Sequence, residues 1–373
     1  MIIMVLDHVR DFVHAAAQSF APDDLSRTTA AIFLTRWITH FCAPVFMLTA
    51  GVGTFLWAQH NKSPSQLTRF LWTRGVWLLL LELTLVRLAF NFNFDYHFIV
   101  LNIIWGLGGC MIGLAVLVRL PWSWLAGVCC GMILLHNLAD VISASQFGRA
   151  AWLWNELHEV GSFEAGGSTI VIAYPLIPWI AVMGAGYCIG CVYLWEADRR
   201  RRFLIGLGLG LTAAFILVRA LNLYGDPVAW SAQSSRLFTL LSFLRCTKYP
   251  PSLDFLLMTL GPALVALGLL ESVTLARTNP VLAFGRVPLF FFVVHLYLIH
   301  ALVVVLGLLR YGTGRFLFNP LPSMGGPAYP PGYGYPLWVC YVAWLGLILA
   351  LYPLCRWFAS MKQRRRDWWL SYL

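Results

Sequence analysis

The chain has 373 residues, of which 60% are hydrophobic and 11% are charged, and its formal net charge is +10. Soluble domains carry roughly 45 to 50% apolar and 25% charged residues, so the composition excludes an ordinary soluble protein. It predicts an all-α, polytopic transmembrane helical bundle that forms one domain over residues 1–373. We assign the positive charge to membrane topology and expect no nucleic-acid partner.

Ten apolar stretches are long enough to cross about 30 Å of hydrocarbon as helices. In chain order, these predicted membrane helices cover residues 1–17, 31–58, 69–90, 97–118, 121–141, 170–195, 203–222, 252–272, 286–309 and 336–356. Pro175 and Pro178 fall inside the sixth stretch and should kink or unwind its helix.

Small residues within these helices are predicted to serve packing. Gly127 with Gly131, and Gly186 with Gly190, are spaced four apart, as in close helix contacts of membrane proteins. The nine cysteines lie mostly within apolar stretches, without the spacing of a disulfide framework or a zinc site. We interpret them as small core residues and expect no metal.

The basic residues are distributed unevenly between the two sides of the predicted bundle. Clusters at residues 199–202 and 364–366 fall on the side that also holds the amino terminus, which predicts that both termini are cytoplasmic. The largest outer segment, about residues 141–169, has four ionisable residues near tryptophans: Glu156, His158, Glu159 and Glu164. This segment could cover a substrate-binding mouth, or it could be an ordinary interfacial loop.

Ionisable residues inside the predicted helices are the most informative feature, because each costs at least about 2.5 kcal/mol at the centre of a membrane helix. The first helix carries Asp7, His8 and Asp11, whose spacing places an imidazole beside carboxylates on one face. The second helix carries Arg36 and His40, one turn apart. These residues could serve catalysis, or the charges could simply neutralise one another.

The depth of the histidines favours a shared site. His40 and His295 each lie nine residues from one end of their helices, which places them roughly 13 to 14 Å deep, near the membrane midplane. His8 is expected at a similar level. Three imidazoles at one level form a centre only if their helices are neighbours, whereas His136 and His300 are predicted to be structural.

Several motifs of other enzyme classes are missing from the sequence. It contains no Gly-x-Ser-x-Gly elbow, no His-Glu-x-x-His helix and no P-loop. Hydrolase and ATP-driven functions therefore lose support. Glu82 with Arg87, and Asp254 with Arg219, are interpreted as buried ion pairs or as residues that snorkel to the membrane interface.

Four blocks of sequence resemble the bacterial branch of the heparan-alpha-glucosaminide N-acetyltransferase catalytic-domain family. They are Met-Val-Leu-Asp-His-Val-Arg-Asp-Phe, Phe-Leu-Thr-Arg-Trp-Ile-Thr-His-Phe-Cys-Ala-Pro, Thr-Lys-Tyr-Pro-Pro-Ser-Leu and Gly-Arg-Val-Pro-Leu-Phe-Phe-Phe-Val-Val-His. The blocks follow in order over about residues 3–300. An Arg-Gly pair that usually precedes the first block is missing, and we expect the natural chain to start upstream of Met1.

The resemblance implies a multi-pass acyltransferase of the bacterial inner membrane. Its donor would be cytoplasmic acetyl-CoA or another acyl-CoA, used as a co-substrate, and its acceptor an extracytoplasmic glycan or amino sugar. His8 matches the catalytic position of the first helix, and His295 matches the late-helix histidine. The general base stays open between His8 and His40. Other expected partners are membrane lipid and a second copy of the chain.

A direct-transfer mechanism fits these residues. Asp7 or Asp11 would orient an imidazole that takes a proton from the acceptor, and Arg36 would stabilise charge on the tetrahedral oxygen. An acyl-histidine intermediate is the alternative chemistry. The phosphates of CoA would be bound by cations of the inner face, namely Lys62, Arg69, Arg74 or Arg286.

Two other classes of function stay open. A transporter of a small polar solute or lipid-linked sugar would also need charges at the midplane and a helix broken near Pro175 and Pro178. The sequence shows no internal repeat of the kind that many transporters have. A noncatalytic scaffold would explain the packing glycines, but it would not explain so many buried ionisable groups.

Overall fold

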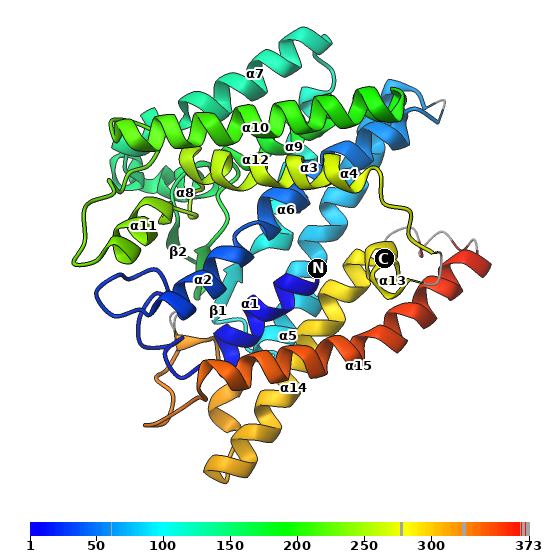
Figure 1. Ribbon diagram of the computed structural model, residues 1–373. Helices are drawn as coiled ribbons and strands as arrows, with labels where there is room; N and C mark the ends of the chain where they lie inside the picture. Colours follow the sequence, from blue (N-terminus) through cyan, green and yellow to red (C-terminus); the bar gives the residue numbers. More distant parts are fainter. Residues whose placement is uncertain (61, 277–278, 323–325, 366, 368–369, 371–373) are drawn as a thin grey trace. The chain divides into compact units, whose positions relative to one another are not determined.

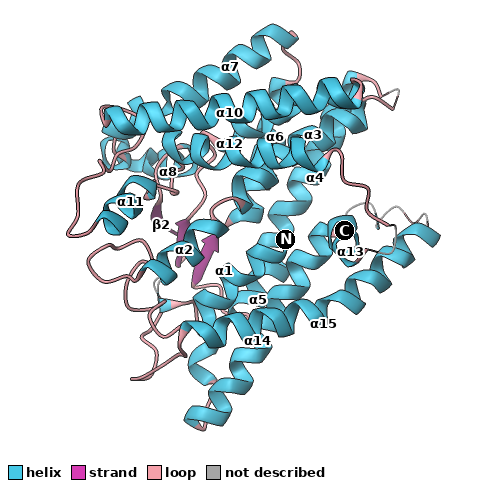
Figure 2. Ribbon diagram, in the orientation of Figure 1, coloured by secondary structure: helices cyan, strands magenta, loops and turns pink. Residues whose placement is uncertain are grey.

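A computed structural model describes residues 1–373 except 61, 277–278, 323–325, 366, 368–369 and 371–373. The described chain is mostly helical, with a small sheet (Figures 1 and 2). Its α-helices are α1 (Ile2–Val13), α2 (Ala30–Thr39), α3 (Cys42–Ala58), α4 (Pro64–Leu81), α5 (Arg87–Asn91), α6 (Ile103–Leu117), α7 (Trp122–Leu135), α8 (Ala151–Leu157), α9 (Trp179–Ile189), α10 (Ala197–Leu221), α11 (Arg236–Leu244), α12 (Leu253–Leu270), α13 (Pro280–Arg286), α14 (Pro288–Tyr311) and α15 (Leu337–Arg364). The shorter elements are the π-helix η1 (Glu82–Val86), the 3₁₀-helices η2 (His136–Val141), η3 (Ala144–Ala150), η4 (Gly190–Leu194) and η5 (Arg315–Phe318), and the strands β1 (Phe98–Leu101), β2 (Gly161–Ala165) and β3 (Ser168–Ile172).

The chain divides into two compact units. The first unit contains Met1–Cys42, Leu83–Phe98 and Leu275–Leu373, and the second contains Ala43–Glu82 and Ile99–Thr274. Each unit is therefore assembled from segments that are far apart in the sequence. The prediction that residues 1–373 act as one domain stays a prediction.

The first unit is built around α1. One face of this helix buries Val5, Val9 and Phe12, each at most 1% exposed, because apolar residues recur every three to four positions. Helices α2, α14 and α15 pack against α1, and α13 packs against α15 (Figure 1). Polar residues in the same helix are therefore held between helices of the first unit.

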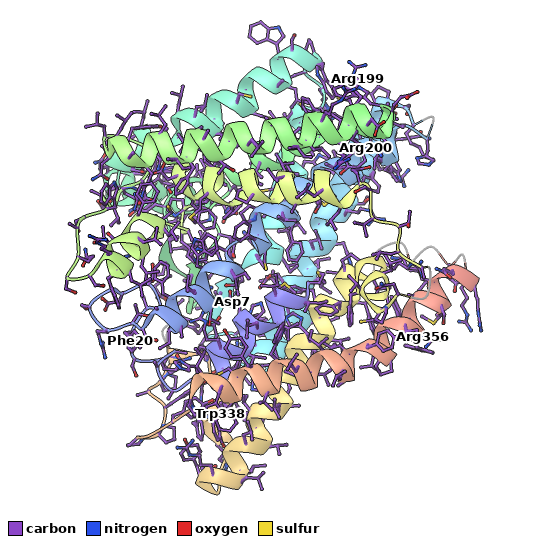
Figure 3. All side chains as sticks on the ribbon, in the orientation of Figure 1. Asp7, Phe20, Arg199, Arg200, Trp338 and Arg356 are labelled. Atoms are coloured by element: carbon purple, nitrogen blue, oxygen red, sulfur yellow. The ribbon has the colours of Figure 1, made fainter. Side chains whose placement is uncertain are left out.

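The second unit contains three packed helix pairs. The long helix α10 lies beside α12, α4 lies beside α6, and α7 lies beside α9 (Figure 1). Gly208 and Gly261 make the first pair close, since a Cβ atom on either would meet backbone of the other helix within 2.8 Å. Arg199 and Arg200, labelled in Figure 3, lie near the start of α10.

The sixth predicted membrane helix was wrong in its first part. Ser168–Ile172 forms strand β3 instead, which pairs antiparallel with β2 and completes a sheet of order β1-β3-β2. Four of its five residues are β-branched and two prolines follow, a sequence that favours a strand and a turn over a helix. Helix α9 starts only after Pro178.

The second predicted membrane helix is interrupted. Helix α2 ends at Thr39 and α3 begins at Cys42, so His40 and Phe41 form a short break. The ring of Pro44 opposes the carbonyl of the residue four positions earlier, which is His40. The break leaves His40 at the C-terminal cap of α2.

Membrane-spanning length is reached by six helical segments of the described chain. These are Ala30–Ala58, Trp122–Val141, Ala197–Leu221, Leu253–Leu270, Pro288–Tyr311 and Leu337–Arg364. Two shorter apolar helices cover Ile103–Leu117 and Trp179–Leu194. The chain is thus a membrane protein, whereas the count of ten crossings is not confirmed.

The two predicted glycine pairs differ in how closely they pack against neighbouring residues. Gly186 packs tightly, since an added Cβ atom would lie 2.0 Å from the carbonyl oxygen of Leu48, and Gly190 similarly meets Phe55 at 2.5 Å. The prediction of close packing is confirmed for this pair. It was wrong for Gly127 and Gly131 within the described chain, where no atom lies within 4 Å of an added Cβ atom.

Candidate active site

Four charged side chains on α1 and α2 of the first unit form one hydrogen-bonded network. Arg36 Nη1 donates to both carboxylate oxygens of Asp7, at 2.8 and 2.6 Å. Arg10 Nη2 donates to Asp7 Oδ1 at 3.1 Å and to Asp11 Oδ1 at 2.6 Å. Asp7, labelled on α1 in Figure 3, joins the two arginines. Two cations and two anions neutralise one another, which offsets the cost of burying charge.

Beside this network, two imidazole rings of the first unit contact each other. The ring centroids of His8 on α1 and His295 on α14 are 5.2 Å apart. His295 is 0% exposed, and its Nδ1 atom lies 3.0 Å from the carbonyl oxygen of Phe291. A carbonyl only accepts hydrogen bonds, so Nδ1 carries a proton and Nε2 of the neutral ring is an acceptor. Among the described residues, none donates to this Nε2 atom.

Aromatic rings line the histidine pair. Phe90 and Phe292 contact the His8 ring edge-on, with centroids 5.9 and 6.4 Å away. Such rings exclude water and leave few polar groups to compete for the imidazole nitrogens. The pair therefore lies in apolar surroundings within the first unit.

Two further histidines of the first unit are buried. His40 is 6% exposed at the end of α2, one turn after Arg36. His300 is 0% exposed, its Nδ1 lies 2.8 Å from the carbonyl oxygen of Ala89, and its ring stacks on Phe92 at 3.9 Å. His300 Nε2 also has no hydrogen-bond partner in the described part of the chain.

Three of the four predicted donor-binding cations lie in the second unit, within the hairpin of α3 and α4. Lys62 Nζ lies 5.4 Å from the centroid of Trp57, and the guanidinium of Arg74 lies 4.6 Å from that of Phe70. The Trp57 and Phe70 rings stack on each other at 4.0 Å. Arg69, the third cation of the second unit, is exposed near the start of α4. Arg286, the fourth predicted cation, is exposed at the end of α13 in the first unit.

A family model described as heparan-alpha-glucosaminide N-acetyltransferase, catalytic, matches residues 1–224. The chain belongs to this family. It is accordingly a transmembrane acetyltransferase by family. Neither the curated proteins nor the solved structures contain a match to the chain.

The matched part of this heparan-alpha-glucosaminide N-acetyltransferase family member includes α1 and α2, with Asp7, His8 and Arg36. His295 and Arg286 lie beyond residue 224. The family match therefore does not cover these two residues. His295 is linked to the matched helices by the contact of its ring with the ring of His8. No group of three histidine, cysteine, aspartate or glutamate residues in the described ranges could hold a metal ion.

Sequence reasoning missed several polar partners of this family member. Arg10 received no role, although its spacing of three from Asp7 was a usable signal. Glu82, 2% exposed, accepts a hydrogen bond from the Trp105 backbone at 3.2 Å, next to the start of α6. Nothing in the sequence indicated that pairing, because 23 residues separate the two.

Proposed function

We propose that the chain transfers an acetyl group from acetyl-CoA to an extracytoplasmic acceptor, and that His8 and His295 form its catalytic centre. The single observation that carries the proposal is the buried contact of these two imidazoles, with His295 Nε2 left as an acceptor that no described residue satisfies. Buried polar atoms are nearly always paired, so this nitrogen is suited to a substrate hydrogen. The family assignment supports the class of reaction.

The proposed step uses His295 as general base. Its Nδ1 proton is held by the Phe291 carbonyl, so Nε2 can take the proton of an acceptor amine or hydroxyl. The acceptor atom then forms a bond to the acetyl carbonyl carbon, the bond from carbon to sulfur breaks, and the CoA thiolate receives the proton. His8, in contact with His295, would orient the acceptor or pass the proton to sulfur.

The charged network would position the centre. Arg36 is held by both oxygens of Asp7, so we propose that it fixes α2 against α1 and places His40, one turn later. Asp11 would complete this arrangement through Arg10. This role differs from the stabilisation of a tetrahedral oxygen by Arg36, which stays a prediction.

Donor binding is assigned to the cations predicted from the sequence: Lys62, Arg69, Arg74 and Arg286. The stacking of Trp57 on Phe70 supports this, because aromatic faces hold the Lys62 and Arg74 cations in place. Guanidinium and ammonium groups suit the phosphates of CoA. We propose that the protein lies in the bacterial inner membrane with both termini in the cytoplasm, and that the amine or glycan acceptor binds on the outer side. Formation of a homodimer stays a prediction.

Purified protein in detergent provides the test. We expect it to bind acetyl-CoA and to transfer radiolabelled acetyl to a primary amine probe, glucosamine, with the label appearing in N-acetylglucosamine. Rapid quench without acceptor should trap no labelled protein, because transfer is direct. A labelled protein would replace direct transfer by an acyl-histidine. Failure to bind acetyl-CoA would remove the enzyme proposal and favour a transporter.

A further inference from the structure

A carboxylate and an imidazole pair at the end of α7 in the second unit. Asp140 on η2 and His158, directly after α8, are joined by a hydrogen bond of 2.8 Å between Asp140 Oδ1 and His158 Nε2. The other carboxylate oxygen of Asp140 accepts a hydrogen bond of 2.8 Å from Asn137 Nδ2. An ionised carboxylate only accepts, so His158 Nε2 carries a proton.

The second ring nitrogen of His158 is the unexplained feature. The side chain is 3% exposed, and its Nδ1 atom has no hydrogen-bond partner among the residues that the structure describes. With the proton on Nε2, Nδ1 of the neutral ring is a buried acceptor. A histidine that only fastened α8 to η2 would leave this acceptor unsatisfied, which is costly. A hydrogen-bond donor placed at Nδ1 would satisfy this acceptor.

The neighbouring rings are already occupied. His136, whose ring centroid lies 6.1 Å from that of His158, has both nitrogens within 2.9 Å of backbone carbonyl oxygens, those of Ile133 and Pro251. The ring of Trp154 lies 5.4 Å from His158, and its Nε1 atom donates to a backbone carbonyl. Within this cluster, His158 Nδ1 is the nitrogen that remains for a ligand.

The charge of the segment that carries the site favours a cation. Although the whole chain has a net charge of +10, residues 140–169 contain four carboxylates and a single basic residue. The carboxylates are Asp140, Glu156, Glu159 and Glu164, and the basic residue is Arg149. Asp140 is the carboxylate next to the imidazole, and its side chain is 23% exposed, so it faces both His158 and solvent. A ligand that donates hydrogen bonds and carries positive charge fits these two groups.

We propose that Asp140 and His158 bind a primary ammonium group, with one N–H donating to His158 Nδ1 and the charge attracted by Asp140. Such a group occurs on amino sugars and on ethanolamine head groups. The binding site itself does not depend on the chemistry at His8 and His295.

The test measures binding of two primary amines, glucosamine and ethanolamine, to the purified full chain by calorimetry. N-acetylglucosamine serves as the probe without a charged amine. His158→Gln keeps a donor toward Asp140 and removes Nδ1, while Asp140→Asn keeps the hydrogen bond and removes the charge. Glu159→Gln is the matched control, because this carboxylate accepts a hydrogen bond from the Ala144 backbone and lies outside the pair.

We expect glucosamine to bind the unmodified protein, and His158→Gln and Asp140→Asn to weaken binding by about 10- to 100-fold. Glu159→Gln should stay within about twofold of the unmodified protein, and N-acetylglucosamine should bind weakly to all four proteins. Binding of neither amine, or equal binding in the variants, would mean that water alone satisfies His158 and would overturn the site. Acetyl-CoA affinity, measured in parallel, should be unchanged in every variant, and its absence from the unmodified protein would instead remove the proposed function.

Discussion

Two buried histidines, one from each unit, differ in how their ring nitrogens are used. His295 in the first unit has one nitrogen paired with a carbonyl and the other without a partner in the described chain. His136 in the second unit has carbonyl oxygens within hydrogen-bond distance of both nitrogens, at 2.9 and 2.8 Å. Burial alone therefore does not identify a catalytic histidine. A ring nitrogen without a partner in the described chain, next to a second titratable group, indicates a ring that can bind a substrate or ligand, as proposed for His295 and His158.

Two arginines, one from each unit, also differ in the partners that they bind. Arg219 in the second unit donates to four backbone carbonyls and lies 3.6 Å from Asp254, so the ion pair predicted from the sequence is confirmed. Arg36 in the first unit pairs with Asp7 and lies one turn before a buried histidine. We interpret Arg219 as a structural residue that holds loops together, and Arg36 as a positioning residue near chemistry.

The largest effect on stability is expected at Arg219. Arg219→Gln should destabilise the fold by about 3 to 5 kcal/mol, because it leaves Asp254 buried without its cation and removes several hydrogen bonds. Arg36→Gln should destabilise less, since its side chain is 15% exposed. Denaturation of both variants in detergent checks this order. A smaller loss at Arg219 than at Arg36 would contradict the structural role assigned to Arg219.

The second prediction uses the glycine pairs of the second unit. Gly186→Ala should destabilise by about 1 to 3 kcal/mol, because the new Cβ atom meets the backbone of Leu48. Gly127→Ala should be neutral or slightly stabilising, since its surroundings are open. Thermal melts of the two variants measure the difference. Equal melting temperatures would show that the close approach of α9 to α3 is not needed.

The third prediction concerns donor affinity. Replacing Lys62, Arg69, Arg74 and Arg286 together by glutamine should raise the KM for acetyl-CoA about tenfold or more while kcat changes less. Glutamine at residues 199–202 is the control, because those arginines are assigned to topology. A similar rise of KM in both sets would indicate general electrostatics instead of a defined pocket.

The smallest effect is expected at Glu156 on α8. Burial raises the pKa of this carboxyl, and the hydrogen bond from Trp105 Nε1 opposes the rise. The folded form thus holds the proton more tightly, so stability falls as pH increases from about 4.5 through the raised pKa. Glu156→Gln keeps an acceptor for Trp105 and should flatten this dependence by about 1 kcal/mol or less. Melting temperatures between pH 4 and 8 check the slope, and an unchanged slope would assign the pH dependence elsewhere.

Sequence periodicity anticipated much of the helical framework. Apolar stretches located the helices because a membrane helix needs a long run without charge, and the i, i+4 spacing of Asp7 and Asp11 placed both beside Arg10. Strand β3 was missed because a short apolar run of β-branched residues satisfies the membrane criterion as well as the strand criterion. The prolines that follow it were the available signal.

Pairings between distant segments could not be predicted. The contact of His8 with His295 joins residues 287 positions apart, and that of Asp140 with His158 joins the end of the predicted helix 121–141 to the predicted outer segment that follows it. Depth in the membrane suggested a common level for His8 and His295, yet it could not indicate which helices are neighbours. Tertiary packing decides that, through contacts that a single sequence does not record.

The central claim, that His8 and His295 form one catalytic centre, is tested most directly by a double-mutant cycle on acetyl transfer. His8→Ala and His295→Ala should each lower kcat by about 10² to 10⁴ with little change in acetyl-CoA affinity, and the double variant should be little worse than either. His136→Ala is the control and should retain activity. Near-normal turnover in both single variants of well-folded protein, together with a large loss in His136→Ala, would contradict the claim.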